Sequence, residues 1–218
     1  MLILAVDTST PAVTAGVVRL DDAGPRPLAT RITVNARAHA EVLTPQILEC
    51  LAEAGIGADD LDAVVVGTGP GPFTGLRVGM ATGAAFADAL GIPVHGVGSL
   101  DAIAAAVPGD REVLVVTDAR RKEVYWARFR GADRIAGPFV SSPADIVVGE
   151  SQVVAGSASH VDIVDLPVEP VESPAPEALV VVAAAALLRG DVPAEPTPQY
   201  LRRPDAVATA DRTPAGTP

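Results

Sequence analysis

A glycine-rich stretch from Gly67 to Gly79 holds the first residues whose types and spacing could do chemistry. It reads GTGPGPFTGLRVG and follows the apolar run LDAVVVG. A Walker A loop requires GxxxxGK followed by Ser or Thr, and the stretch has no Lys. A dinucleotide loop requires GxGxxG, and counting from Gly69 the third glycine position is Thr74. Both common phosphate motifs are excluded, although backbone N–H groups at a helix start could still hold an anion.

Small residues recur every four positions in the helix expected after this loop. They are Gly75, Gly79, Gly83 and Ala87. Residues four apart share one face of a helix, so the stripe lets another backbone approach closely. Glycine in a helix interior costs about 0.8–1 kcal/mol relative to Ala, so a close contact must offset the loss. The spacing leaves open whether that contact is internal or made with another chain.

Two acidic residues end apolar runs and are candidates for nucleotide chemistry. Asp7 and Asp118 could bind a metal ion or orient phosphate through water. The alternative is that each caps its own turn, as Asp often does.

The histidines and the cysteine argue against a metal centre. His39 opens a helical pattern, but Leu43 stands four residues later, where a second helical ligand would face it. His95 and His160 are remote in sequence and have no accompanying acidic pattern. The single cysteine, Cys50, excludes an internal disulfide and falls within an apolar helical pattern, as a buried residue would.

The composition indicates an ordered globular protein. The 218 residues are 49% hydrophobic and carry a formal net charge of −11, which argues against a broad basic surface for nucleic acid. The longest apolar run, from Ala178 to Leu188, is shorter than the roughly 20 residues that span a bilayer. The N-terminal MLILAVDTS lacks a signal-peptide pattern. We therefore expect a cytoplasmic protein without a membrane segment.

The elements that must position these residues form two similar halves. The sequence predicts one hairpin from Leu2 to Leu20 and another from Glu112 to Phe129. Placing Asp7 on Asp118 gives an offset of 118 − 7 = 111, which also places Val13 on Val124. An offset of about half the chain predicts a duplication.

Helical and strand patterns follow each hairpin, which predicts an α/β fold. In the first half we expect helices at 38–54 and 74–90, a strand at 94–97 and a helix from residue 99. Pro45 should kink or divide the first helix near Thr44. The second half predicts a strand in SQVVAGS and a helix at 177–188, flanked by proline-rich connectors. The expected units are residues 1–108, residues 109–204, and a disordered tail at 205–218.

Five motifs, in this order, resemble the TsaB (YeaZ) family of bacterial tRNA threonylcarbamoyladenosine biosynthesis proteins. They are LILAVDTST, HAEVLTP, GTGPGPFTGLRVG, DARRKEVYWARF and PQYLRRP. The resemblance covers roughly residues 1–203. It implies an actin-like, sugar-kinase and Hsp70-like ATPase fold, with two duplicated subdomains that each open with a β-hairpin.

The resemblance also implies a role and partners. The family's proteins are non-catalytic subunits that pair with the transferase TsaD and help to recruit the ATPase TsaE. The complex transfers a threonylcarbamoyl group to the adenosine next to the anticodon of tRNAs that read codons beginning with A. By this resemblance the chain binds no cofactor alone, ATP is used through the ATPase partner, and tRNA is met only within the complex. TsaD carries two metal-binding histidines four apart on a helix, and Leu43 departs from that pattern.

The resemblance assigns pairing with TsaD to the two helices of the first half. The contact positions it implies are Leu43, Ile47, Gly75, Gly79, Met80 and Gly83. Arg120 and Arg121 in the second hairpin turn either hold the complex or an anion, or belong to a solvated turn. Two other functions remain open: an active kinase or metalloprotease of the same fold, and a regulator that self-associates weakly.

Overall fold

The computed structural model describes residues 1–35, 38–157 and 159–202. The predicted tail at 205–218 lies outside these ranges. No helix within them has the length and apolar character needed to cross a membrane.

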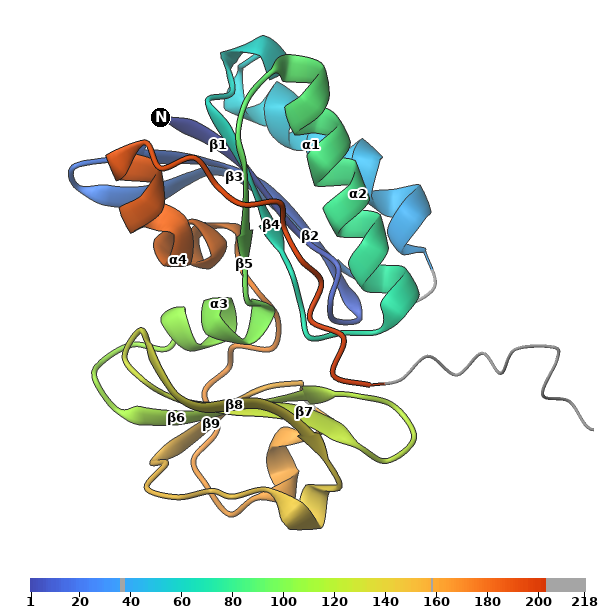
Figure 1. Cartoon of the computed structure of the whole chain (residues 1–218), viewed down its shortest axis with the longest axis vertical. Coiled ribbons are helices and arrows are strands. Elements are labelled where there is room, and N and C mark those ends of the chain that lie inside the picture. Colours follow the sequence, from blue (N-terminus) through green and yellow to red (C-terminus); the bar gives the residue numbers. More distant parts are fainter. Residues whose placement is uncertain (36–37, 158, 203–218) are drawn as a thin grey trace, which may run out of the picture.

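Two β-sheets organise the chain (Figure 1). The first has the order β3-β2-β1-β4-β5, and the second has the order β8-β7-β6-β9. In each, an antiparallel three-stranded meander is extended by a strand parallel to its first strand. The strands are β1 (Leu2–Asp7), β2 (Ala12–Asp21), β3 (Gly24–Val34), β4 (Ala63–Gly67), β5 (Val94–Val97), β6 (Glu112–Asp118), β7 (Val124–Arg130), β8 (Asp133–Ser141) and β9 (Val153–Gly156).

Helices cover both faces of the first sheet and one face of the second. Two pack on one side of the first sheet, one packs on its other side, and a short one lies between the sheets (Figure 1). In that order they are α1 (His39–Ala54), α2 (Phe73–Leu90), α4 (Pro176–Arg189) and α3 (Ser99–Ala105). Short 3₁₀ turns are η1 (Ala58–Asp60), η2 (Pro143–Asp145) and η3 (Val161–Ile163).

The first strand is apolar from Leu2 to Val6, as is typical of a strand with both faces buried. Successive side chains of a strand point to opposite sides. Leu4 and Val6 pack under α1 and α2, whereas Ile3 and Ala5 pack against α4. Burial on both sides explains why this run shows no polar alternation.

The predicted duplication is confirmed by the shared strand order, with one change in register. Asp7 pairs with Thr14 across the first hairpin, but Asp118 pairs with Val124 across the second. The second turn is therefore one residue shorter. The offset of 111 holds for the first strands, and the second strand of each hairpin differs from it by one residue.

Three expectations from the sequence need correction. The helix is not divided at Pro45, because α1 runs from His39 to Ala54 without a break. The third strand of each meander, β3 and β8, was not predicted. Finally, α4 falls inside the range 109–204 expected for the second unit, yet its apolar side chains complete the core of the first sheet.

An extended strap at residues 191–202 leads away from α4 (Figure 1). It passes Gly96 of β5 and then reaches the end of β4, where the Gln199 N–H donates to the Thr68 carbonyl at 2.9 Å. Beyond it, the Arg202 guanidinium donates to the Ala119 carbonyl at 2.8 Å, in the turn of the second hairpin. The strap thereby connects the two sheets.

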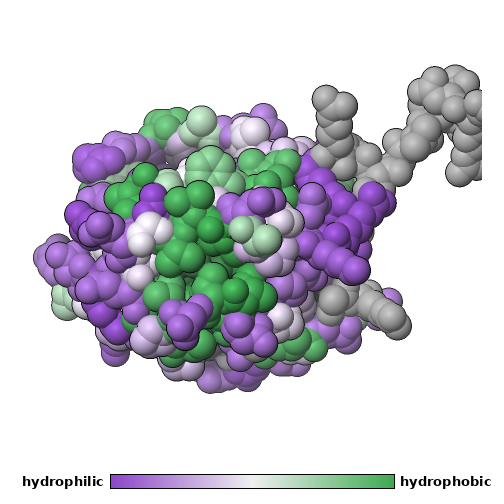
Figure 2. Space-filling view, turned by 90° about the horizontal axis from the view of Figure 1, so that it is seen from below, coloured by the Kyte–Doolittle hydropathy of each residue, from purple (hydrophilic) through white to green (hydrophobic). Residues whose placement is uncertain are grey.

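Within the described part of the chain, no α-helix lies over the far face of the second sheet. Figure 2, which views the molecule from this side, shows an area of apolar side chains in its centre. Short 3₁₀ turns and loops cover the sheet here. The partly buried side chains packed on it are Ile146, Val148, Ile163, Val164 and Leu166.

Candidate functional site

The small-residue stripe of α2 receives a side chain from the turn after β1. The Thr8 hydroxyl donates to the Gly75 carbonyl at 2.6 Å and accepts from the Gly79 N–H at 2.8 Å. An α-helix ordinarily pairs these two backbone groups with each other. Thr8 thus links the first hairpin turn to the first turns of α2. Gly75 and Gly79 have no side chains, and this leaves room for the Thr8 hydroxyl.

Asp7 is buried and fully engaged within the chain. One carboxylate oxygen accepts from the N–H and hydroxyl of Ser9, both at 2.8 Å. The other accepts from the Ser99 hydroxyl at 2.5 Å. Burial raises the pKa of Asp7 above its ordinary value of 3.8, and the hydrogen bonds from Ser99 and Ser9 oppose that rise without cancelling it.

This raised pKa predicts a pH-dependent effect of Asp7→Asn on stability. Between pH 3.8 and the raised folded value, the native state binds more protons than the unfolded state, so stability falls as pH rises. The side-chain amide of the Asp7→Asn variant does not titrate. The stability of the wild type minus that of Asp7→Asn should therefore increase as pH falls through this window, in guanidinium unfolding curves recorded at several pH values. A difference that stays constant, or that grows with rising pH, would contradict the assignment.

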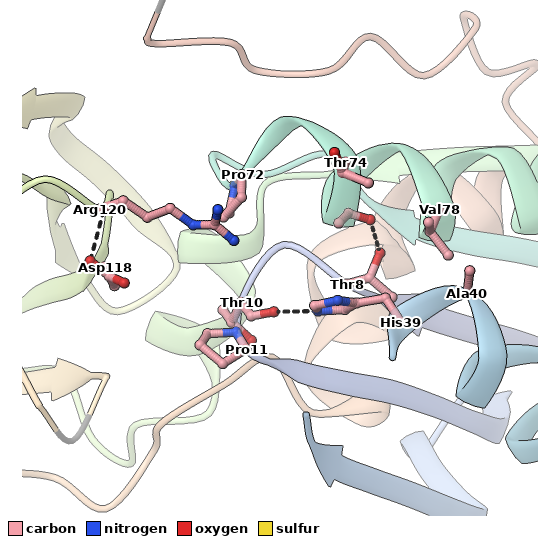
Figure 3. A pocket seen from close by; sticks show the side chains of 11 residues that line it. Thr8, Thr10, Pro11, His39, Ala40, Pro72, Thr74, Val78, Asp118 and Arg120 are labelled. Carbon is pink, nitrogen blue, oxygen red and sulfur yellow. Dashed lines mark hydrogen bonds between the residues drawn. The ribbon is translucent and has the colours of Figure 1, made fainter. Parts of the chain in front are cut away.

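A cleft opens between the two hairpin turns and the N-terminus of α2 (Figure 3). Its cavity volume is about 180 Å³. Thr8, Thr10 and His39 line one side, and the His39 Nε2 atom lies 3.0 Å from the Thr10 carbonyl, which makes Nε2–H the donor. Arg120 extends from the opposite side toward Pro72 (Figure 3). Hydroxyl groups, an imidazole and a guanidinium thus share one cleft, whose lining also includes the apolar side chains of Pro11, Pro72 and Val78.

The second hairpin turn presents consecutive cationic residues in an unusual conformation. Arg120, Arg121 and Lys122 all have positive φ, of 62°, 52° and 63°. The Asp118 carboxylate accepts from the Arg120 N–H at 2.7 Å and lies 3.7 Å from Nε2 of His160. Asp118 therefore caps its own turn, as the alternative interpretation of the sequence expected, and it also lines the cleft.

Five of the six predicted contact positions are buried against the protein's own core rather than exposed on its surface. Leu43 and Ile47 lie on the inner face of α1 and are fully buried. A Cβ on Gly75 would meet the Thr8 carbonyl oxygen at 2.8 Å, and one on Gly83 would strike Val66.

The remaining predicted contact positions are Gly79 and Met80. A Cβ on Gly79 would lie 2.5 Å from the Thr8 hydroxyl, so this glycine also faces inward. Met80 is partly buried against the same core. The close neighbour of the stripe is this chain's own first sheet.

The outward face of the two helices carries different residues. Leu48 on α1 is 56% exposed, and Ala81, Ala84 and Ala85 on α2 are exposed. The sequence contained the signal for this face, since the exposed positions lie between the buried ones at helical spacing. We define the outward helix face by Leu48, Ala81 and Ala85.

An aromatic contact that the sequence did not predict lies at the start of α2. The Phe73 and Tyr200 rings stack with centroids 5.2 Å apart. The Arg77 guanidinium lies 4.7 Å from the Phe73 centroid, and its Nε donates to the Tyr200 hydroxyl at 2.8 Å. Residues 73 and 200 are far apart in sequence, so only the path of the strap brings them together.

Comparison with known proteins agrees with this architecture. The family model described as TsaD: tRNA N6-adenosine threonylcarbamoyltransferase matches residues 32–167. The solved structure of YeaZ from Pseudomonas aeruginosa superposes with a TM-score of 0.77 at 28% identity, covering 92% of this chain and 100% of that one.

Sequence relatives give the same picture. An uncharacterized protein of Mycobacterium tuberculosis is 55% identical, over 94% of this chain and 93% of its own length. An uncharacterized protein of Mycobacterium leprae is 55% identical over 98% of this chain, which spans only 58% of that relative. The Escherichia coli tRNA threonylcarbamoyladenosine biosynthesis protein TsaB is 34% identical over 60% of this chain and 55% of its own length.

The two sheets of like strand order define an α/β protein with the actin-like ATPase and sugar-kinase fold. Within that class, the match to YeaZ and the similarity to TsaB identify the family. The chain belongs to the TsaB (YeaZ) family.

The nucleotide and metal ion that this fold implies do not fit the candidate residues. Asp7 is 1% exposed, and both of its oxygens are held by Ser9 and Ser99. Among the residues that the structure describes, no three His, Cys, Asp or Glu side chains lie together as metal ligands. The predicted role of Asp7 as a metal or phosphate ligand is therefore replaced by a structural one: its carboxyl group holds Ser9 and Ser99.

Proposed function

We propose that this chain is a non-catalytic subunit of the complex that transfers a threonylcarbamoyl group to tRNA. The single observation that carries the proposal is its place in the TsaB family. The helix that would hold two metal ligands supports it. His39 bonds the Thr10 carbonyl, and Leu43, at the second ligand position, is buried in the core.

We further propose that TsaD is the pairing partner and that the outward helix face is the contact. The matching family model is that of a threonylcarbamoyltransferase, and two chains of one fold can present the same helices to each other, as the subunits of a symmetric dimer do. Leu48 supplies an exposed apolar anchor, and Ala81 and Ala85 let a partner helix approach closely. In this scheme TsaE supplies ATP hydrolysis, and the tRNA substrates are those that read codons beginning with A.

Reconstitution tests the proposal. Unmodified tRNA is incubated with TsaD, TsaE, ATP and the threonylcarbamoyl donor, with this chain present or omitted, and modified adenosine is measured. We expect modification only when the chain is present, and none from the chain alone. Equal modification without the chain would refute the subunit role, and modification by the chain alone would refute the non-catalytic role.

A further inference from the structure

A basic and aromatic patch surrounds the start of α2. We define this basic–aromatic patch by Phe73, Arg77, Arg120, Lys122 and Tyr200. The two rings are 49% and 40% exposed, and the three cationic residues are also exposed.

The strap lies between the patch residues on α2 and those in the turn of the second hairpin. Tyr200 packs on Phe73 and accepts a hydrogen bond from Arg77. Two residues later, Arg202 donates to the Ala119 carbonyl, directly before Arg120. Arg120 also lines the cleft with Pro72, directly before Phe73. The patch is therefore one continuous surface that spans both sheets.

Two carboxylates lie beside this surface, but neither pairs with its cationic side chains: Asp118 accepts from the Arg120 backbone N–H, and Glu123 pairs with Arg202. Arg31, Arg111, Arg128, Arg130, Arg134 and Arg189 each form an ion pair. Within the described ranges, no carboxylate lies at ion-pair distance from Arg77, Arg120 or Lys122. In a chain of net charge −11, these cations form a local positive area.

We propose that the basic–aromatic patch binds the tRNA substrate within the complex, with its cations on backbone phosphates and its exposed rings against an unstacked base. This inference rests on the proposed function. Phosphate neutralisation by Lys and Arg supplies most non-specific affinity for nucleic acid. Aromatic rings beside such cations are the usual platform for single-stranded bases.

The chemistry of the patch favours RNA over an acidic protein segment. A carboxylate-rich segment would need the cations but not two exposed rings that already stack on each other. A base has a flat face that can extend such a stack. Arg77 lies on α2, the helix that also carries Ala81 and Ala85 of the outward helix face.

The test compares two variants of equal charge change. Arg120→Gln/Lys122→Gln removes two cations from the patch, and Arg19→Gln/Arg26→Gln removes two exposed cations from the hairpin of β2 and β3, where they pair across the two strands. Affinity for an unmodified tRNA transcript is measured by fluorescence anisotropy across a salt series, with the full chain alone and with TsaD.

We expect the patch variant to bind tRNA about tenfold more weakly, and its slope of log affinity against log salt to fall by about 1.5. The hairpin variant should match the wild type. Tyr200→Leu should weaken binding several-fold without changing the slope, because stacking releases no counterions.

Separate readouts distinguish failure of this inference from failure of the proposed function. Pairing with TsaD and modification at saturating tRNA report on the subunit role, whereas affinity and salt slope report on the patch. Equal affinity and slope for both double variants, alone and with TsaD, would overturn the inference. Loss of TsaD affinity with unchanged tRNA affinity would also overturn it, and would make the patch a protein contact.

Discussion

Gly79→Leu is expected to destabilise the fold rather than to act only on a partner. A Cβ at this position would lie 2.5 Å from the Thr8 hydroxyl, which bonds the Gly79 N–H in the native chain. Overpacking of this kind costs about 1–3 kcal/mol, and loss of the Thr8 bridge adds to it. The better helix propensity of Leu returns about 0.8 kcal/mol. We expect a net loss of about 2 kcal/mol in guanidinium unfolding.

Ala84→Leu is the matched control, since Ala84 lies on the same helix and is exposed. Its unfolding free energy should stay within about 0.5 kcal/mol of the wild type. If Gly79→Leu were as stable as Ala84→Leu, Thr8 and α2 could not be packed as described.

Leu48→Arg is expected to weaken pairing with TsaD while leaving the fold intact. Leu48 is 56% exposed on α1, so a charged side chain can extend into water in the free protein. At the centre of a helix contact, the same guanidinium would lose its hydration without a partner. We expect at least about a tenfold loss of affinity by calorimetric titration, or about 1.4 kcal/mol.

Leu188→Arg provides an equal substitution away from the proposed contact. Leu188 is 55% exposed, but it lies on α4, on the opposite side of the first sheet. Its affinity for TsaD should equal that of the wild type. If Leu48→Arg and Leu188→Arg bound TsaD with equal affinity, the outward helix face would be ruled out as the contact, whatever the result of the reconstitution. Light scattering of the same two variants would show whether self-association uses this face.

The sequence predicted the order of the elements well because burial patterns are local. Apolar runs marked β1, β4, β6 and β9, and four-residue spacing marked α1 and α2. The third strands were missed for physical reasons. Pro25 and Pro27 interrupt β3, and Pro138 interrupts β8, so neither reads as a regular strand.

The sequence could not say which neighbour each helix face meets. Gly75, Gly79 and Gly83 require a close contact, but their spacing is the same whether the contact is a partner helix or a hydroxyl from the first hairpin. The resemblance favoured a partner, and the positions of Thr8 and Val66 show an internal contact instead. The stack of Phe73 on Tyr200 was equally hidden, because it depends on the path of the strap.

The packing of α4 on the first sheet sets an order for events during synthesis. Ile3, Ala5 and Val18 leave the ribosome first, but the α4 side chains that cover them are translated more than 150 residues after Val18. Until then one face of the first sheet remains open to water or to a chaperone. The first sheet is made first, yet its core is completed only after the whole second sheet has been synthesised.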